Sequence, residues 1–132
     1  HNVVTDLMLG WSSEGIVSFA NSCRSRGITP GFVTLNPGEI PWMVDKIGTD
    51  AWFMTSVNSA GVQMSPSREI VEKEVLSRDE INILAMSVLG GGILDPKEEI
   101  PRALSFPAVK SLVIGSGNIG HIGELQEVIQ SC

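Results

Sequence analysis

The stretch KSLVIGSGNIGHIGEL, from Lys110 to Leu125, joins a short apolar run to a glycine-rich turn and then to a helical pattern. The turn itself, Gly115 to Gly120, spells GxGxxG. A turn that ends a strand and opens a helix directs backbone N–H groups and a partial positive charge at its surroundings, which suits a phosphate. The stretch therefore predicts a strand, a turn and a helix. Its glycines indicate either a phosphate site or a plain tight turn.

The same alternation of strand and helix recurs along the chain. Apolar, β-prone runs are separated by helical patterns, and they begin at Asp6, Gly31, Ala51, Asn82 and Ser111. These runs are almost continuously apolar, which is typical of parallel strands buried on both faces. We therefore expect residues 1–132 to form a single α/β domain or a partial barrel, with five parallel strands that are each followed by a helix.

Several residues predict where the helices begin and end. Ser65 and Pro66 are expected to form the cap and first turn of one helix. Asp95 is expected to cap the next, and Pro101 to break it or force a restart. The last helix is expected to carry its apolar residues on one face, namely Ile119, Ile122, Leu125, Val128 and Ile129.

The length of the chain leaves two architectures open. A Rossmann fingerprint requires a second strand after its helix, with an acidic residue about 20 positions on. The sequence ends at Cys132, one helix after the turn. The remaining possibilities are a five-stranded doubly wound sheet of the flavodoxin type and the C-terminal portion of a TIM barrel, whose usual length is about 250 residues.

Composition restricts the compartment and the partners. The net charge of −6 and the lack of a basic cluster argue against nucleic acid and anionic membrane surfaces as partners. No apolar run approaches the roughly 20 residues of a membrane span, and no signal peptide is recognisable. Cys23 and Cys132 show neither metal-ligand nor disulfide spacing, so we expect free thiols in the cytoplasm. Because the chain opens with His1, we expect a processed product or a piece of a longer protein.

The segment INILAMSVLGGGILDPKEEIPRALSFPAVKSLVIGSGNIGHIGELQEVI, Ile81 to Ile129, resembles the last two βα units of the aldo-keto reductases. In that family the seventh strand reads like AYSPLGRG and the eighth like VIPGTSNPEHLEEN. A fainter likeness reaches back to Asp6 and brings the resemblance to about five of the eight barrel units. The resemblance implies the C-terminal part of a (β/α)8 barrel that reduces a small-molecule carbonyl compound with NADP(H).

The resemblance also implies which residues contact the cofactor. From the seventh strand, Ser87, Leu89 and Gly90 match a family segment that lies along the cofactor pyrophosphate. The GxGxxG turn would hold the NADP phosphates through Ser116, Gly117 and Asn118.

The chain departs from the family at its catalytic centre. The family protonates the carbonyl oxygen with a tyrosine, and this chain contains none. Trp11 stands where the family has a histidine. None of the family's catalytic residues can therefore be placed in this sequence. Trp11 is instead a candidate for the wall of the substrate pocket. Asn36 and Asn58, each at the end of a strand, are candidates for orienting a carbonyl group, or else they form turns.

A partial barrel would leave interior side chains and two strand edges exposed. We therefore expect this chain to self-associate or to pair with a missing N-terminal half-barrel. Two other functions stay open. One is a flavodoxin-like domain that binds a flavin or a phosphate, and the other is a barrel relative that serves as a non-catalytic scaffold.

Overall fold

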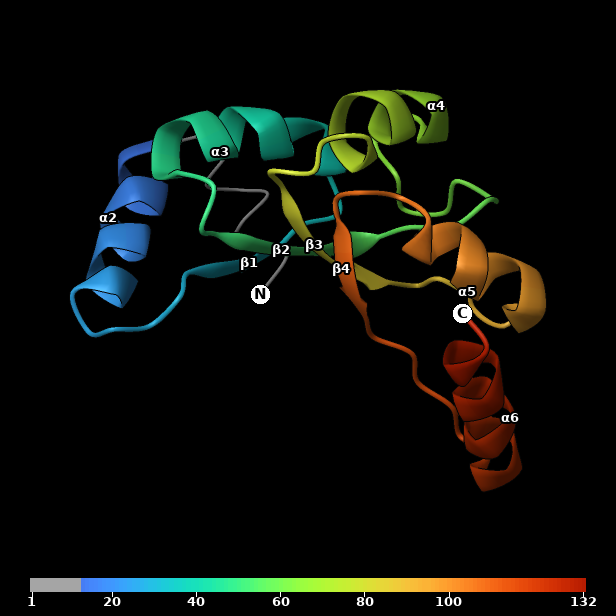
Figure 1. Cartoon of the computed structure of the whole chain (residues 1–132). Coiled ribbons are helices and arrows are strands. Elements are labelled where there is room, and N and C mark those ends of the chain that lie inside the picture. Colours follow the sequence, from blue (N-terminus) through green and yellow to red (C-terminus); the bar gives the residue numbers. More distant parts are fainter. Residues whose placement is uncertain (1–12) are drawn as a thin grey trace.

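A computed structural model describes residues 13–132, so the run that begins at Asp6 and the candidate Trp11 lie outside the described residues. Within the described residues, four strands form one sheet (Figure 1). They are β1 (Gly31–Val33), β2 (Trp52–Ser56), β3 (Asn82–Met86) and β4 (Val109–Leu112). All neighbouring pairs are parallel, and the strand order β1-β2-β3-β4 follows the sequence. The expected α/β class with a parallel sheet is confirmed.

Helices connect the strands. The described helices are α2 (Ser13–Arg24), the short 3₁₀ helix η1 (Pro37–Glu39), α3 (Ile40–Ile47), α4 (Arg68–Val71) continued by the π-helical η2 (Glu72–Leu76), α5 (Pro96–Leu104) and α6 (Ile119–Gln130). Each crossover between consecutive strands carries at least one of them, as a parallel connection requires. Within residues 13–132, no helix combines the length and apolar character needed to cross a membrane.

Two of the expected helix boundaries are wrong. The hydroxyl of Ser67, and not that of Ser65, caps α4 by accepting a hydrogen bond from the backbone N–H of Ile70. Pro101 does not interrupt α5, which continues to Leu104. A proline removes only one backbone donor, and the buried side chains of Ile100 and Ala103 anchor this helix to the core.

The cap of α5 and the end of β3 also have clear physical causes. Asp95 caps α5 as expected, because its carboxylate accepts a hydrogen bond of 2.9 Å from the N–H of Lys97. The apolar run NILAMSVL, from Asn82 to Leu89, extends beyond Met86, whereas β3 ends at Met86. The strand ends there because Ser87 has a φ of 53°, which no extended strand can accommodate.

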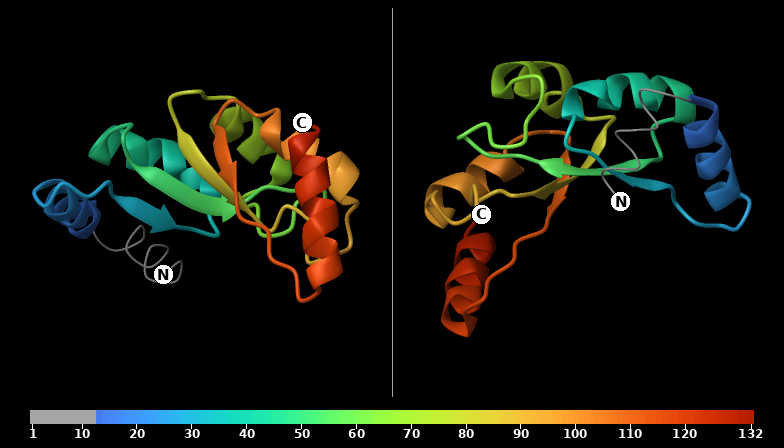
Figure 2. Two further views of the ribbon diagram at one scale, coloured as in Figure 1. Left: turned by 60° about the horizontal axis from the view of Figure 1, so that its bottom comes forward. Right: turned by 180° about the vertical axis from the view of Figure 1, so that it is seen from behind.

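The two faces of the sheet differ in burial. On the first face Phe32, Phe53 and Ile83 are buried, and the ring of Phe32 contacts Phe19 of α2 with ring centroids 5.4 Å apart. Figures 1 and 2 show α3 and α4 lying over this side of the sheet. The second face carries Val33, Trp52, Met54, Leu84 and Met86, which are half-buried or exposed, and at the carboxyl end of β2 the buried Ser56. The described helices therefore bury one apolar face and leave the other partly exposed.

Helix α6 projects away from the sheet and packs against α5 (Figure 1). Of its expected apolar face, Leu125 is buried and Val128 is half-buried. Ile119 is 88% exposed, and Ile122 and Ile129 are also exposed. The apolar face of α6 is therefore only partly buried, because α6 meets its neighbours along a narrow stripe.

The loops that follow β1 and β2 are in close contact. The N–H of Gly38 in η1 donates a hydrogen bond of 3.1 Å to the carbonyl oxygen of Ser65. A Cβ atom on Gly38 would lie 2.6 Å from Cδ of Pro66 and 3.3 Å from that carbonyl oxygen. Glycine is therefore required at this position by the approach of the other loop.

We expect Gly38→Ala to destabilise the fold by about 1–3 kcal/mol, because the methyl group must displace the Ser65 to Pro66 backbone. Gly31→Ala is the matched control, since a Cβ atom at Gly31 in β1 would meet nothing within 4 Å. Urea unfolding followed by circular dichroism measures both. Equal midpoints for the two variants would contradict the proposed close approach.

Candidate functional site

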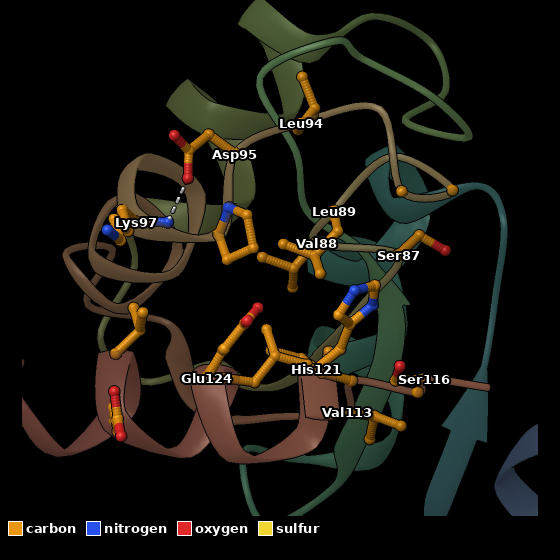
Figure 3. A pocket seen from close by; sticks show the side chains of 18 of the residues that line it. Ser87, Val88, Leu89, Leu94, Asp95, Lys97, Val113, Ser116, His121 and Glu124 are labelled. Carbon is orange, nitrogen blue, oxygen red and sulfur yellow. Dashed lines mark hydrogen bonds between the residues drawn. The ribbon is translucent and has the colours of Figure 1, made fainter. Parts of the chain in front are cut away.

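A pocket of about 1210 Å³ lies at the carboxyl ends of β3 and β4. Its walls are the segment from Ser87 to Lys97, the segment from Val113 to Gly117, and one side of α6 (Figure 3). The carboxyl edge of a parallel sheet is where α/β proteins hold their ligands. This pocket is therefore the candidate binding site.

The structure brings together four of the six residues that the resemblance assigns to the cofactor. Ser87 and Leu89 line the pocket from one wall, and Ser116 and Gly117 line it from another. The other two have local roles. Gly90 has a φ of 55° in the turn after β3, and Asn118 caps α6 by accepting a hydrogen bond of 2.8 Å from the N–H of Gly120.

The glycines of the GxGxxG turn are not required by its geometry. Gly115, Gly117 and Gly120 all lie outside the left-handed region of φ. A Cβ atom on Gly115 or Gly117 would meet nothing within 4 Å. The backbone of this turn therefore faces open space, and both of these glycines border the pocket.

Charged side chains concentrate on the α5 and α6 walls of the pocket. His121 and Glu124 rise from α6 into the pocket, and Lys97 lies at the end opposite Ser87 (Figure 3). Asp95 and Glu127 complete the ionisable lining. An anionic ligand would be repelled by the Glu124 carboxylate and attracted to the first turn of α6, where backbone N–H groups carry partial positive charge.

The two candidate substrate residues within the described part of the chain, Asn36 and Asn58, do not line the pocket. Asn36 is half-buried at the start of η1, and its side chain makes no capping hydrogen bond. Asn58 is fully buried. Its Nδ2 donates to the carbonyl oxygens of Val62 and Ser87 at 3.0 and 3.3 Å, and its Oδ1 accepts from the N–H of Val62 at 2.9 Å. Asn58 therefore shapes the loop after β2 and reaches the pocket only through the backbone of Ser87.

A second contact holds the same loop against α5. Glu99 is only 4% exposed, and its carboxylate accepts a hydrogen bond of 2.9 Å from the N–H of Ser59. Arg68 donates to the carbonyl oxygen of Ser59 at 2.6 Å. The charged groups around this loop are thus directed at its backbone and fix its position.

The sequence analysis did not find a polar cluster formed by Ser56, Gln63 and Ser87. The hydroxyl of Ser56 donates to Oε1 of Gln63 at 3.2 Å, and that of Ser87 does so at 3.5 Å. Gln63 and Ser87 both have positive φ, at 58° and 53°. The family resemblance marks Ser87 but neither Ser56 nor Gln63, because the loop conformation alone brings Gln63 to the two serines.

The described residues contain no group of three or more His, Cys, Asp or Glu side chains that could hold a metal ion. Comparisons of the chain with protein-family models, with curated proteins and with solved structures found no match.

We expect Asn58→Ala to destabilise the fold by about 1–3 kcal/mol, because it removes the three hydrogen bonds that this fully buried side chain makes to the backbone of Val62 and Ser87. Asn36→Ala serves as the control and should change stability by less than about 0.5 kcal/mol. Both are measured by urea unfolding. A loss of stability in Asn58→Ala no larger than that in Asn36→Ala would show that the hydrogen bonds of Asn58 do not hold the loop.

Proposed function

We propose that this chain is the C-terminal portion of a (β/α)8 barrel similar to the aldo-keto reductases, and that its pocket binds the phosphates of NADP(H). The observation that supports this most is the meeting of Ser87 and Leu89 with Ser116 and Gly117 around one pocket. Those four residues come from two strand ends about 30 positions apart in the sequence. The resemblance assigns all four residues to one ligand.

The strand order supports a barrel segment over a doubly wound sheet. A doubly wound sheet reverses its strand order and places helices on both faces. The four described strands follow one another without reversal, and α3 and α4 lie on the same side of the sheet (Figure 2). The partly exposed second face would then be the barrel interior, where further strands would cover it.

The chemistry of the turn supports a phosphate ligand. A phosphate that approaches the backbone needs positions without side chains, and Gly115 and Gly117 provide them where the turn geometry does not demand glycine. The hydroxyl of Ser116 and the imidazole of His121 add polar groups to the same wall. Bound NADPH would supply a hydride to a carbonyl carbon. We assign to this chain the phosphate site and not the catalytic residues, because it contains no tyrosine.

The compartment and the partners follow from the same proposal. Cys23 and Cys132 are free thiols, which supports a reducing cytoplasm. The exposed side chains of the second face, such as Trp52, support association with another copy or with the remaining barrel units.

We expect calorimetric titration with NADPH to show saturable binding, and Gly117→Leu to abolish it by filling the space beside the turn. Gly123→Ala is the control, because Gly123 does not line the pocket and its Cβ atom would meet nothing within 4 Å. Binding that survives Gly117→Leu would contradict the phosphate site. Binding of FMN in place of NADPH would favour the flavodoxin-like alternative.

We expect light scattering to show self-association of the chain, and Trp52→Lys to shift it toward the monomer, since a charge on the second face opposes its burial. Ile93→Lys is the control. It also introduces a lysine, at a residue that is 76% exposed in the loop after β3, and it should have little effect on self-association. A wild-type chain that stays monomeric at all concentrations would contradict association through this face.

A further inference from the structure

A buried carboxylate lies outside the pocket and takes no part in the proposed phosphate site. Glu99 of α5 is only 4% exposed, and it does not line the pocket. Its Oε2 atom accepts a hydrogen bond of 2.9 Å from the N–H of Ser59, in the loop after β2. The Nη1 atom of Arg102, from the next turn of α5, lies 3.7 Å from the same oxygen. Glu99 therefore ties α5 to the backbone of that loop.

Stability alone does not explain why a carboxylate is buried here. Burial of a carboxylate is unfavourable unless close ion pairs and hydrogen bonds compensate for the lost water. The pairing with Arg102 is long, and the buried Nη1 atom of Arg102 makes no hydrogen bond to the described residues. An apolar side chain of similar volume often stabilises such a contact equally well. What the carboxylate adds is a directed hydrogen bond that fixes the position of Ser59.

A second charged group holds the other side of Ser59. Arg68, at the start of α4, donates a hydrogen bond of 2.6 Å to the carbonyl oxygen of Ser59. Both backbone polar groups of Ser59 are thus bound by charged side chains, and these come from two different helices. Ser59 is consequently fixed relative to α4 and α5, although it lies in a loop.

The fixed loop is connected to the wall of the pocket through Asn58. Asn58 directly precedes Ser59, and its Nδ2 atom donates a hydrogen bond of 3.3 Å to the carbonyl oxygen of Ser87. The N–H of Gly90 donates to the same oxygen at 2.9 Å. The bond from Gly90 shapes the turn after β3, whereas the bond from Asn58 sets the position of that turn relative to the loop after β2.

Glu99 thereby connects two walls of the pocket. The first, the α5 wall, consists of Pro96, Lys97 and Pro101. The second, the Ser87 wall, begins at Ser87, whose φ of 53° persists only where the surroundings hold it. The path from Glu99 through Ser59 and Asn58 to Ser87 contains two hydrogen bonds and a single peptide bond. So short a path transmits a displacement at one wall to the other.

We propose that Glu99 is a positioning residue for the pocket, and that its hydrogen bond with Ser59 sets the separation between the α5 wall and the Ser87 wall. The inference rests on the proposed function only for the identity of the ligand as NADPH. Loss of this hydrogen bond lets the Ser87 wall shift. The pocket then holds its ligand less tightly, although no residue that lines it has changed.

The first measurement needs no ligand. It records the backbone amide signals of Ser87, Val88 and Leu89 in the ¹⁵N-labelled full chain, with circular dichroism as the check that each variant is folded. Glu99→Ala should shift or broaden these signals, because it removes the acceptor for the N–H of Ser59. Glu99→Gln should leave them close to wild type, since its side-chain oxygen can still accept this hydrogen bond. Unchanged signals in a folded Glu99→Ala variant, or equal shifts in both variants, would overturn the proposal.

Two further variants make this test specific. Glu98→Ala is the matched control and should leave the signals unchanged, because Glu98 is the exposed neighbour of Glu99 on α5 and does not line the pocket. Arg68→Met removes the hydrogen bond to the carbonyl oxygen of Ser59 at a partly exposed side chain, and it should shift the same signals. If Glu99→Ala does not fold, unchanged signals in Arg68→Met would overturn the proposal.

Calorimetric titration with NADPH then measures the effect on the ligand. The affinity should fall about tenfold in Glu99→Ala and less than about twofold in Glu99→Gln and Glu98→Ala. Failure of the wild-type chain to bind NADPH overturns the phosphate site, and the signals of the ligand-free chain still decide the role of Glu99. NADPH binding that is equally tight in wild type and in a folded Glu99→Ala variant overturns the role of Glu99 alone.

Discussion

Parallel pairing is the constraint on which the rest of this structure depends. Two parallel strands can be joined only by a crossover, so every strand of the sheet brings a helix with it. Because the strand order follows the sequence, successive crossovers add helices along the sheet and bury its first face through Phe32, Phe53 and Ile83. The second face receives no such cover from the described helices. The partial exposure of Trp52 and Met54 is thus a consequence of topology and not of a local defect in packing.

The same constraint gathers the polar chemistry at one edge. All four strands point in one direction, so the residues that follow them meet at their carboxyl ends. Ser56 and Ser87 become neighbours in this way although 31 positions separate them in the sequence. In this arrangement the backbone at Ser87 is strained. Its positive φ ends β3 and turns the chain toward the pocket. Asn58 and Glu99 hold the neighbouring loop, which stabilises the strained turn from outside the pocket.

The sequence predicted the structure correctly where local interactions determine it. Continuous apolar runs located β2 and β3, and a side-chain cap located the start of α5 at Asp95. The prediction was wrong where tertiary packing overrides a local conformational preference. Pro101 lies inside α5 because Ile100 and Ala103 pack in the core. Four of the predicted cofactor residues do meet at one pocket, whereas Gln63 could not be found, because nothing in its local sequence indicates the loop conformation that brings it to two serines.

The two regions of the carboxyl edge differ in chemistry, and this difference bears on how one ligand would lie there. The walls formed by α5 and α6 carry Lys97, His121 and Glu124 together with the backbone donors that open α6. The region around Gln63 is neutral and borders the methionines of the second face. Ser87 belongs to both regions, because it lines the pocket and donates to Gln63. A ligand that extended over both regions would place its ionic groups beside α6 and an uncharged part beside Gln63, with Ser87 between them.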